Sequence, residues 1–146
     1  MKSVIYLDLC AIQRPLDSKD QIRIALEAEA VLGILSLVEA NKVSLISSAI
    51  LLFEINRSSN QIRKEYALEV VSKATDFINT SPKIEKRSRE FVNLGIGLLD
   101  AVHLASAEDS RVDYFCTCDD AFLKKARKIS GLKIRVLSPL ELVKEL

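Results

Sequence analysis

Four carboxylates draw attention because each one follows or interrupts an apolar segment: Asp8, Glu54, Asp100 and Asp119. Asp8 ends the apolar stretch VIYL, and a charge beside a buried strand is costly unless a partner satisfies it. Glu54 lies in AILLFEI, whose apolar residues cover nearly the whole circumference of a helix. Its carboxylate is therefore expected against apolar surface, where it also needs a partner.

Asp100 and Asp119 stand at predicted helix starts, where free backbone N–H groups favour a carboxylate. Each has an ordinary structural interpretation as a helix cap, and Asp8 has one as a turn residue. If all of them converge, however, like charges lie close together and a bound cation relieves the repulsion. Ligand sets made only of oxygen favour Mg²⁺ or Mn²⁺, and such sites often act on phosphates.

The chain offers few ligands of other kinds. It has three cysteines and a single histidine, His103, which fits a reducing compartment better than a disulfide framework. A zinc site built on Cys116 and Cys118 would need two further ligands. We therefore expect buried thiols. His103 follows Asp100 by three residues on the same helix face, so it is either a packed core histidine or a support for the carboxylates.

The elements that must position these side chains follow from apolar patterning. Strands are predicted at residues 4–7, 42–47, 112–117 and 132–138. Helices are predicted at 21–41, 49–57, 60–78, around 83–89, from Asp100, from Asp119 or Asp120, and at 139–146. The segment from residue 9 to 21 is expected to be a loop, ending in a capping box formed by Ser18 and Gln21.

This order of strands and helices predicts an α/β fold, with a central parallel sheet flanked by helices on both faces and a single domain over residues 1–146. Ligands of such sheets gather at the carboxyl ends of the strands. Asp8 follows the first strand and Asp119 follows the third, so both are expected at that edge.

Composition limits the class of protein without deciding it. The 21 Lys and Arg residues nearly balance the 20 Asp and Glu residues, so net charge argues neither for nor against nucleic acid. The uncharged run VSLISSAILLF is too short to span a membrane, and the N-terminal apolar run is interrupted by Asp8. A cytoplasmic protein is expected. Basic segments at 83–89 and 124–128 either follow an RNA backbone or are solvated surfaces, and a leftover apolar helical face would serve a homodimer or another partner.

The motifs together resemble the PIN domains, metal-dependent ribonucleases that include the VapC-type toxins of toxin–antitoxin pairs. The resemblance spans nearly the whole chain and rests on Asp8 after the first strand, Glu54 in LLFEI, Asp100 in LLDAVHLASA and Asp119 in TCDDAF. The last of these is similar to the family pattern T-x-D-x-x-F, with Thr117 in place.

The resemblance implies a specific activity. Asp8, Asp100 and Asp119 would hold one or two Mg²⁺ or Mn²⁺ ions, and Glu54 would coordinate the ion or orient water for hydrolysis of an RNA phosphodiester. Asp120 and Thr117 would support the site, and Arg14 in QRP would contact substrate phosphate or be an ordinary loop arginine. The implied partners are an RNA substrate and a cognate antitoxin.

The chain departs from the family at residues 9 and 10, where Leu and Cys replace the more usual Thr or Ser followed by Asn or Ser. A haloacid-dehalogenase-like phosphatase would need a second Asp at position 10, where Cys10 stands, and a phosphate-transfer receiver shares only the first Asp. A non-catalytic or stand-alone nucleic-acid-binding module of the same fold is the stronger alternative.

Overall fold

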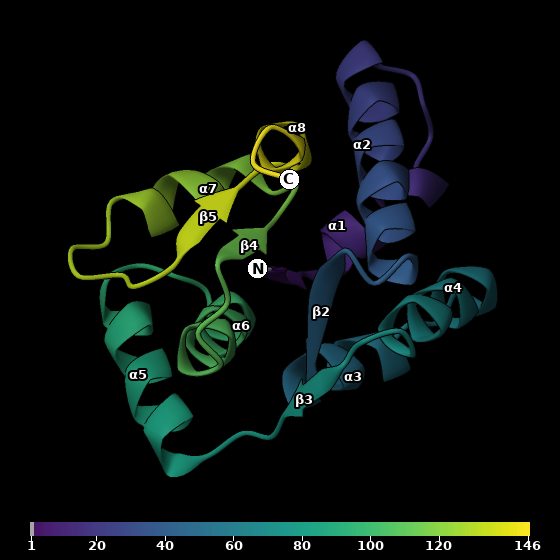
Figure 1. The fold of residues 1–146 in the computed structure, drawn as a ribbon. Helices are drawn as coiled ribbons and strands as arrows, with labels where there is room; N and C mark the ends of the chain where they lie inside the picture. Colours follow the sequence, from purple (N-terminus) through teal and green to yellow (C-terminus); the bar gives the residue numbers. More distant parts are fainter. Residues whose placement is uncertain (1) are drawn as a thin grey trace.

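The computed structural model describes residues 2–146 and has a five-stranded, entirely parallel sheet at its centre (Figure 1). The strands are β1 (Ser3–Leu7), β2 (Val43–Ser48), β3 (Asp76–Ile78), β4 (Tyr114–Cys116) and β5 (Arg135–Leu137). Their order across the sheet is β3-β2-β1-β4-β5, so the N-terminal strand lies in the middle. The predicted parallel α/β architecture is confirmed.

Helices cover both faces of this sheet. They are α1 (Leu9–Gln13), the 3-10 helix η1 (Arg14–Leu16), α2 (Ile22–Glu39), α3 (Ala49–Asn56), α4 (Gln61–Val71), α5 (Pro82–Asn93), α6 (Leu98–Asp109), α7 (Asp120–Arg127) and α8 (Pro139–Val143). Figure 1 shows α5, α6 and α7 on one side of the sheet, and α2 and α4 on the other. The result is the three-layer arrangement that the order of elements predicts.

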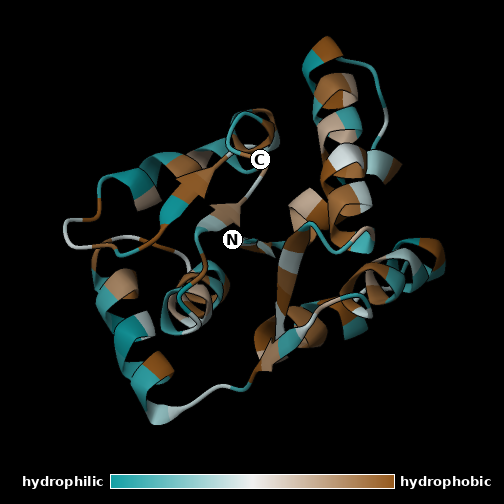
Figure 2. Cartoon of the chain, viewed as in Figure 1, coloured by the Kyte–Doolittle hydropathy of each residue, from teal (hydrophilic) through white to brown (hydrophobic). Residues whose placement is uncertain are grey.

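Alternation along the strands explains the two cores. Side chains of successive strand residues point to opposite faces, so Ile5 and Leu7 of β1 pack with α2 and α4, whereas Tyr6 packs with α5, α6 and α7. All three are fully buried. In Figure 2, β2 and most of β5 are coloured as hydrophobic, while α5 and α7 alternate between the two colours as amphipathic helices do. The central strands therefore serve two apolar layers at once.

One predicted helix was too long. The helix expected over 60–78 ends at Val71, and the chain then forms the edge strand β3. Val70, Ala74 and Ile78 are spaced four residues apart, which imitates a helix. Pairing with β2 decides the conformation instead: the N–H of Thr75 donates to the carbonyl of Leu45 at 3.0 Å, and β3 follows in register. A strand of three residues carries too little periodicity to be recognised alone.

The expected loop at residues 9–21 was also wrong in its first half, where α1 and η1 form. Asp8 caps α1, because its carboxylate accepts from the N–H of Ala11. The predicted capping box is absent: α2 begins at Ile22, and the side chain of its N-cap residue, Gln21, makes no capping bond. Across residues 2–146, no helix has the length and apolar character that crossing a membrane demands.

Candidate active site

Four helices begin at the carboxyl-terminal edge of the sheet. α1 and α3 follow β1 and β2 directly, α7 begins shortly after β4, and α6 runs back toward the start of β4. The free N–H groups and the positive dipole end of each helix therefore point to this edge, where they favour negative charge. The sequence places an acidic residue or a capping serine at each of these starts.

Asp8 lies directly after the central strand and is buried, with 6% of its surface exposed. Its backbone N–H continues the sheet by donating to the carbonyl of Cys116 at 3.1 Å. Its Oδ1 accepts from the N–H of Ala11 and from the thiol of Cys10, both at 3.0 Å. Burial raises the pKa of Asp8 well above its usual value. Asp8 is thus the N-cap of α1, where its ordinary interpretation was a turn residue, and it is also a desolvated carboxyl at the edge where ligands gather.

Asp119 is the N-cap of α7, where its Oδ1 accepts from the N–H of Phe122 at 3.1 Å. The loop before it is fixed by Thr117, a buried residue whose hydroxyl accepts from the N–H of Asp119 at 3.1 Å. Thr117 also lies 3.5 Å from the sulfur of Cys10. Thr117 therefore connects the ends of β1 and β4.

Asp100 lies in the first turn of α6, after the N-cap Gly97, and is partly buried. Burial raises the pKa of Asp100, and the nearby carboxylates of Asp119 and Glu54 raise it further, while His103 and Lys125 act in the opposite direction. The like-charge repulsion predicted from the sequence is therefore present around Asp100. It joins residues from three different helices, α3, α6 and α7.

Glu54 projects from α3 and is held by His103 of α6, whose Nε2 hydrogen-bonds to Oε1 of the carboxylate. His103 has only 1% of its surface exposed. Its other ring nitrogen, Nδ1, lies 2.6 Å from the hydroxyl of Tyr6. The partner that Glu54 requires is thus a buried histidine, and of the two roles considered for His103 the structure favours support of a carboxylate.

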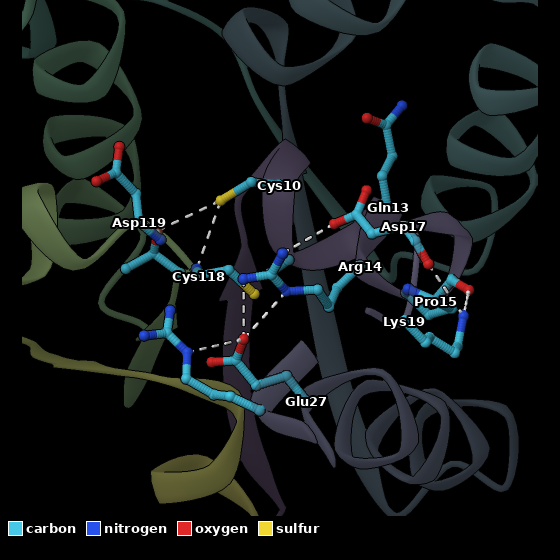
Figure 3. Close-up of polar contacts among 12 residues, drawn as sticks. Cys10, Gln13, Arg14, Pro15, Asp17, Lys19, Glu27, Cys118 and Asp119 are labelled. Atoms are coloured by element: carbon cyan, nitrogen blue, oxygen red, sulfur yellow. Dashed lines mark hydrogen bonds and ion pairs between the residues drawn. The ribbon is translucent and has the colours of Figure 1, made fainter. Parts of the chain in front are cut away.

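Arg14 is engaged in ion pairs beside the site (Figure 3). Asp120 is engaged in another. Both Arg14 amino groups lie 2.9 Å from a carboxylate, one from Asp17 and the other from Glu27. Asp120 is exposed and pairs with Arg23 of α2 at 2.7 Å. Glu27 is buried and also lies 3.6 Å from Arg23, so one carboxylate holds two guanidinium groups.

Sequence reasoning missed Glu27 as a residue of this region. A charged residue on the buried stripe of an amphipathic helix was the available signal, because such a residue is rarely buried without a partner.

The cysteines are only partly as expected. Cys116 and Cys118 are buried, and burial raises the pKa of the Cys116 thiol well above its usual value. As a whole residue Cys10 is instead exposed, because it lies in the first turn of α1 at the edge of the sheet. Its sulfur atom, however, points inward and contacts Asp8, Thr117 and Cys118. The contact with Cys118, together with burial of the sulfur, raises the pKa of Cys10. The group therefore stays a thiol and donates to Asp8.

The donors fit a divalent cation in kind, since Asp8, Glu54, Asp100 and Asp119 offer only carboxylate oxygens. Among residues 2–146, no group of three or more His, Cys, Asp and Glu side chains is gathered so that it could hold a metal ion as it stands. The structure brings Asp100 within electrostatic reach of Asp119 and Glu54, and does not draw all four acids into one cluster.

Comparison with known proteins identifies the family. The profile of the PIN domain matches residues 5–128, which is most of the chain. The chain belongs to the PIN domain family. Membership makes it a protein of a nuclease family, whose members hydrolyse nucleic acids, and the resemblance seen in the motifs is confirmed. A search among curated proteins gives no significant match by sequence.

Solved structures show the same PIN fold at low sequence identity. A chain of VapBC2 from Rickettsia felis, bound to a DNA fragment from its promoter, has a TM-score of 0.61 and 14% identity, with 92% of this chain and 98% of that chain covered. PAE2754 from Pyrobaculum aerophilum has a TM-score of 0.56 and 16% identity, covering 99% and 97%. DNA-bound VapBC from Salmonella typhimurium has a TM-score of 0.56 and 16% identity, covering 95% and 99%.

Proposed function

We propose that this PIN domain is a metal-dependent ribonuclease and the toxin of a type II toxin–antitoxin pair, and that residues 1–146 act as one nuclease domain. The observation that carries the proposal is the position of Asp100, which lies within electrostatic reach of Asp119 and Glu54 at an edge where four helices begin. A carboxyl group such as Asp100, whose pKa is raised by burial and by acidic side chains of other elements, is typical of functional sites.

The carboxylates have distinct roles in this proposal. Asp8, Asp100 and Asp119 would hold Mg²⁺ or Mn²⁺, and Glu54 would either complete the ligand set or orient the attacking water. The ion, when bound, supplies a Lewis acid that lowers the pKa of water and neutralises charge on the phosphodiester. The thiol of Cys10 and the N–H of Ala11 donate hydrogen bonds that fix the Asp8 carboxylate. The hydroxyl of Thr117 accepts from the N–H of Asp119 and fixes the loop that carries it.

The substrate would be held by basic residues of α7. Lys124, Lys125 and Lys128 are exposed on this helix or at its end, and the charge of Lys125 reaches Asp100. Lysines beside an acidic site can bind the phosphates that flank the cleaved bond without reading the sequence. Arg14 is committed to Asp17 and Glu27, so a contact with substrate phosphate would require it to leave these ion pairs.

A protein partner follows from the surface and from the relatives. Ile22 and Leu26 of α2, Phe53 of α3 and Ile62 of α4 are large apolar side chains that are more than half exposed. Exposed apolar side chains of this size are typical of protein interfaces. Two of the similar structures are VapBC complexes, so we propose a cognate antitoxin and a homodimer as the partners in the cytoplasm, where the free thiols remain reduced.

The decisive experiment measures cleavage of RNA by purified protein with Mg²⁺ or Mn²⁺ and with a chelator. We expect cleavage only with the metal, and we expect Asp100→Asn to reduce the rate by at least about 100-fold, since it removes a charged ligand while keeping shape. Asp76→Asn is the matched control, because Asp76 is exposed and lies on the outer strand β3, two strands away from β1.

Binding of RNA without cleavage under any of these metal conditions would contradict the nuclease. It would favour the alternative, a non-catalytic or stand-alone nucleic-acid-binding PIN module. Cleavage that Asp100→Asn leaves intact would instead place the active site elsewhere. Gel electrophoresis of the RNA distinguishes these outcomes, because protein-bound RNA and cleaved RNA migrate differently.

A further inference from the structure

We propose that Tyr6 and His103 are positioning residues, which form a buried hydrogen-bond chain that fixes the tautomer of the imidazole and thereby the orientation of the Glu54 carboxylate. This inference rests on the proposed function for the role of Glu54 itself. The hydrogen-bond chain is a property of the folded protein and can be tested without any measurement of cleavage.

The chain runs from the end of β2 through β1 to α6 and α3. The hydroxyl of Tyr6 lies 2.6 Å from the hydroxyl of Ser48 and 2.6 Å from Nδ1 of His103. Nε2 of His103 is hydrogen-bonded to Oε1 of Glu54. As the N-cap of α3, the Ser48 hydroxyl also accepts a hydrogen bond from the N–H of Leu51 at 3.1 Å. Four side chains on four elements are thus connected in one line.

Only one arrangement of protons satisfies every donor and acceptor in this hydrogen-bond chain. Ser48 accepts from Leu51, so its own proton is free to go to the oxygen of Tyr6. The Tyr6 hydroxyl then donates to Nδ1 of His103, which leaves the ring proton on Nε2, where it is donated to the carboxylate of Glu54. In the reverse direction the Ser48 proton would have no acceptor among the hydrogen bonds of residues 2–146.

Burial enforces this order of donors and acceptors along the hydrogen-bond chain. Tyr6 and Ser48 are fully buried and His103 nearly so, and a buried polar group without its partner costs about 1–3 kcal/mol. Burial also raises the pKa of the Tyr6 hydroxyl, which keeps its proton for donation. The ring of Tyr6 is fixed by stacking on Phe115, with centroids 5.1 Å apart. The donor to Nδ1 is therefore rigid.

The chemical consequence falls on the two oxygens of Glu54. Oε1 is occupied by His103, and among the described residues Oε2 makes no hydrogen bond or ion pair. His103 and Asp100 are three residues apart on α6, so the bond to His103 keeps the Glu54 carboxylate on the side of Asp100. Holding one oxygen in this way orients the other, as a second hydrogen bond to a ligating group commonly does in metal sites.

The first test reads the tautomer directly by long-range ¹H–¹⁵N NMR of the metal-free protein without a histidine tag. His103 is the only histidine in the chain, so the imidazole signals belong to it alone. We expect one tautomer with the proton on Nε2 in the wild type, and a mixture in Tyr6→Phe. Tyr66→Phe is the matched control, because its hydroxyl forms no hydrogen bond with the described residues, and it should match the wild type.

The second test measures Mg²⁺ affinity by calorimetry. Tyr6→Phe and His103→Leu should weaken binding by about 10-fold or more, the usual effect of removing such a support. His103→Gln retains an amide donor of similar reach and should recover part of the affinity, which a loss of packing alone would not predict. Folding of each variant is checked by its thermal transition.

The outcomes separate the inference from the proposed function. A proton on Nδ1 in the wild type, an unchanged tautomer in Tyr6→Phe, or an unchanged Mg²⁺ affinity in both Tyr6→Phe and His103→Leu would overturn the inference. A wild-type protein that neither binds Mg²⁺ nor cleaves RNA would overturn the proposed function, while the tautomer spectra would still decide whether the hydrogen-bond chain exists.

Discussion

At the scale of single residues, the ionisation of Asp100 works against folding. Its carboxylate loses hydration on burial and lies near the negative charges of Asp119 and Glu54, so its pKa is higher in the folded protein than in the unfolded chain. Below the unfolded pKa of about 4 both states carry the proton and the effect vanishes. As the pH rises through the folded pKa, the native state bears the full cost of the charge.

Asp100→Asn should therefore stabilise the metal-free protein, and the gain should grow as the pH rises from about 4 to 7. The expected gain is on the order of 1 kcal/mol, as is common when strain in an active site is removed. Thermal or urea unfolding in chelator measures it. An equal difference at pH 4 and pH 7 would show that ionisation of Asp100 is not its cause.

Glu27 illustrates the opposite case, a buried carboxylate whose charge is compensated by Arg14 and Arg23. Glu27→Ala should destabilise the protein by about 3 kcal/mol, because it leaves the little-exposed Arg14 without its main partner. Glu29→Ala, at an exposed position on the same helix, is the control and should change stability by less than about 0.5 kcal/mol. Similar losses in both variants would mean that the ion pairs of Glu27 are not responsible, because Ala itself favours the helix.

At the scale of elements, some helix caps only stabilise their helix, whereas others also belong to a helix that carries a residue of the proposed site. Ser48 caps α3, which carries Glu54, and Ser81 caps α5 beyond the edge strand β3. Each hydroxyl accepts one backbone N–H of its helix, from Leu51 and Ile84 respectively. The two caps are alike in energy but differ in what their helices position.

Ser48→Ala and Ser81→Ala should each lower the free energy of unfolding by about 1 kcal/mol. Only Ser48→Ala should also reduce RNA cleavage, because it removes the hydroxyl that orders Tyr6 and loosens the helix that carries Glu54. Denaturation and initial cleavage rates, measured on the same samples, compare the two. Equal cleavage rates at equal folded fractions would separate the cap of α3 from the chemistry.

The same elements show what local sequence determines. Caps at Ser48, Asn60 and Asp119, and Pro139 at the start of α8, were predictable because capping depends on neighbouring residues only. Strand β3 was not, because its conformation depends on pairing with β2, far away in the sequence. The acids proposed for the site were chosen from their type and spacing. The chain through Tyr6 was not, because a tyrosine in a buried strand looks like any other core residue.

At the scale of the whole molecule, the proposed toxin should harm a cell in proportion to its nuclease activity. Expression of the wild-type chain in a bacterial host should arrest growth, and Asp8→Asn at the same protein level should not, since it removes a charged ligand from the site. Growth curves with immunoblots of both proteins measure this effect. Arrest by both would mean that toxicity has another origin, such as aggregation through the exposed side chains of α2.

The central position of β1 has a consequence for how the protein is made. β1 cannot pair with β4 until β4 has been synthesised. The N–H of Val4, for example, donates to the side chain of Asp113 at 2.8 Å, 109 residues later in the chain. At ribosomal speed that interval is on the order of 10 s, and such distant pairings also close slowly. Asp8 receives its neighbours Cys116 and Thr117 only then. A nascent chain therefore emerges from the ribosome without a formed catalytic edge, and the proposed nuclease becomes active only after nearly its whole length has been synthesised.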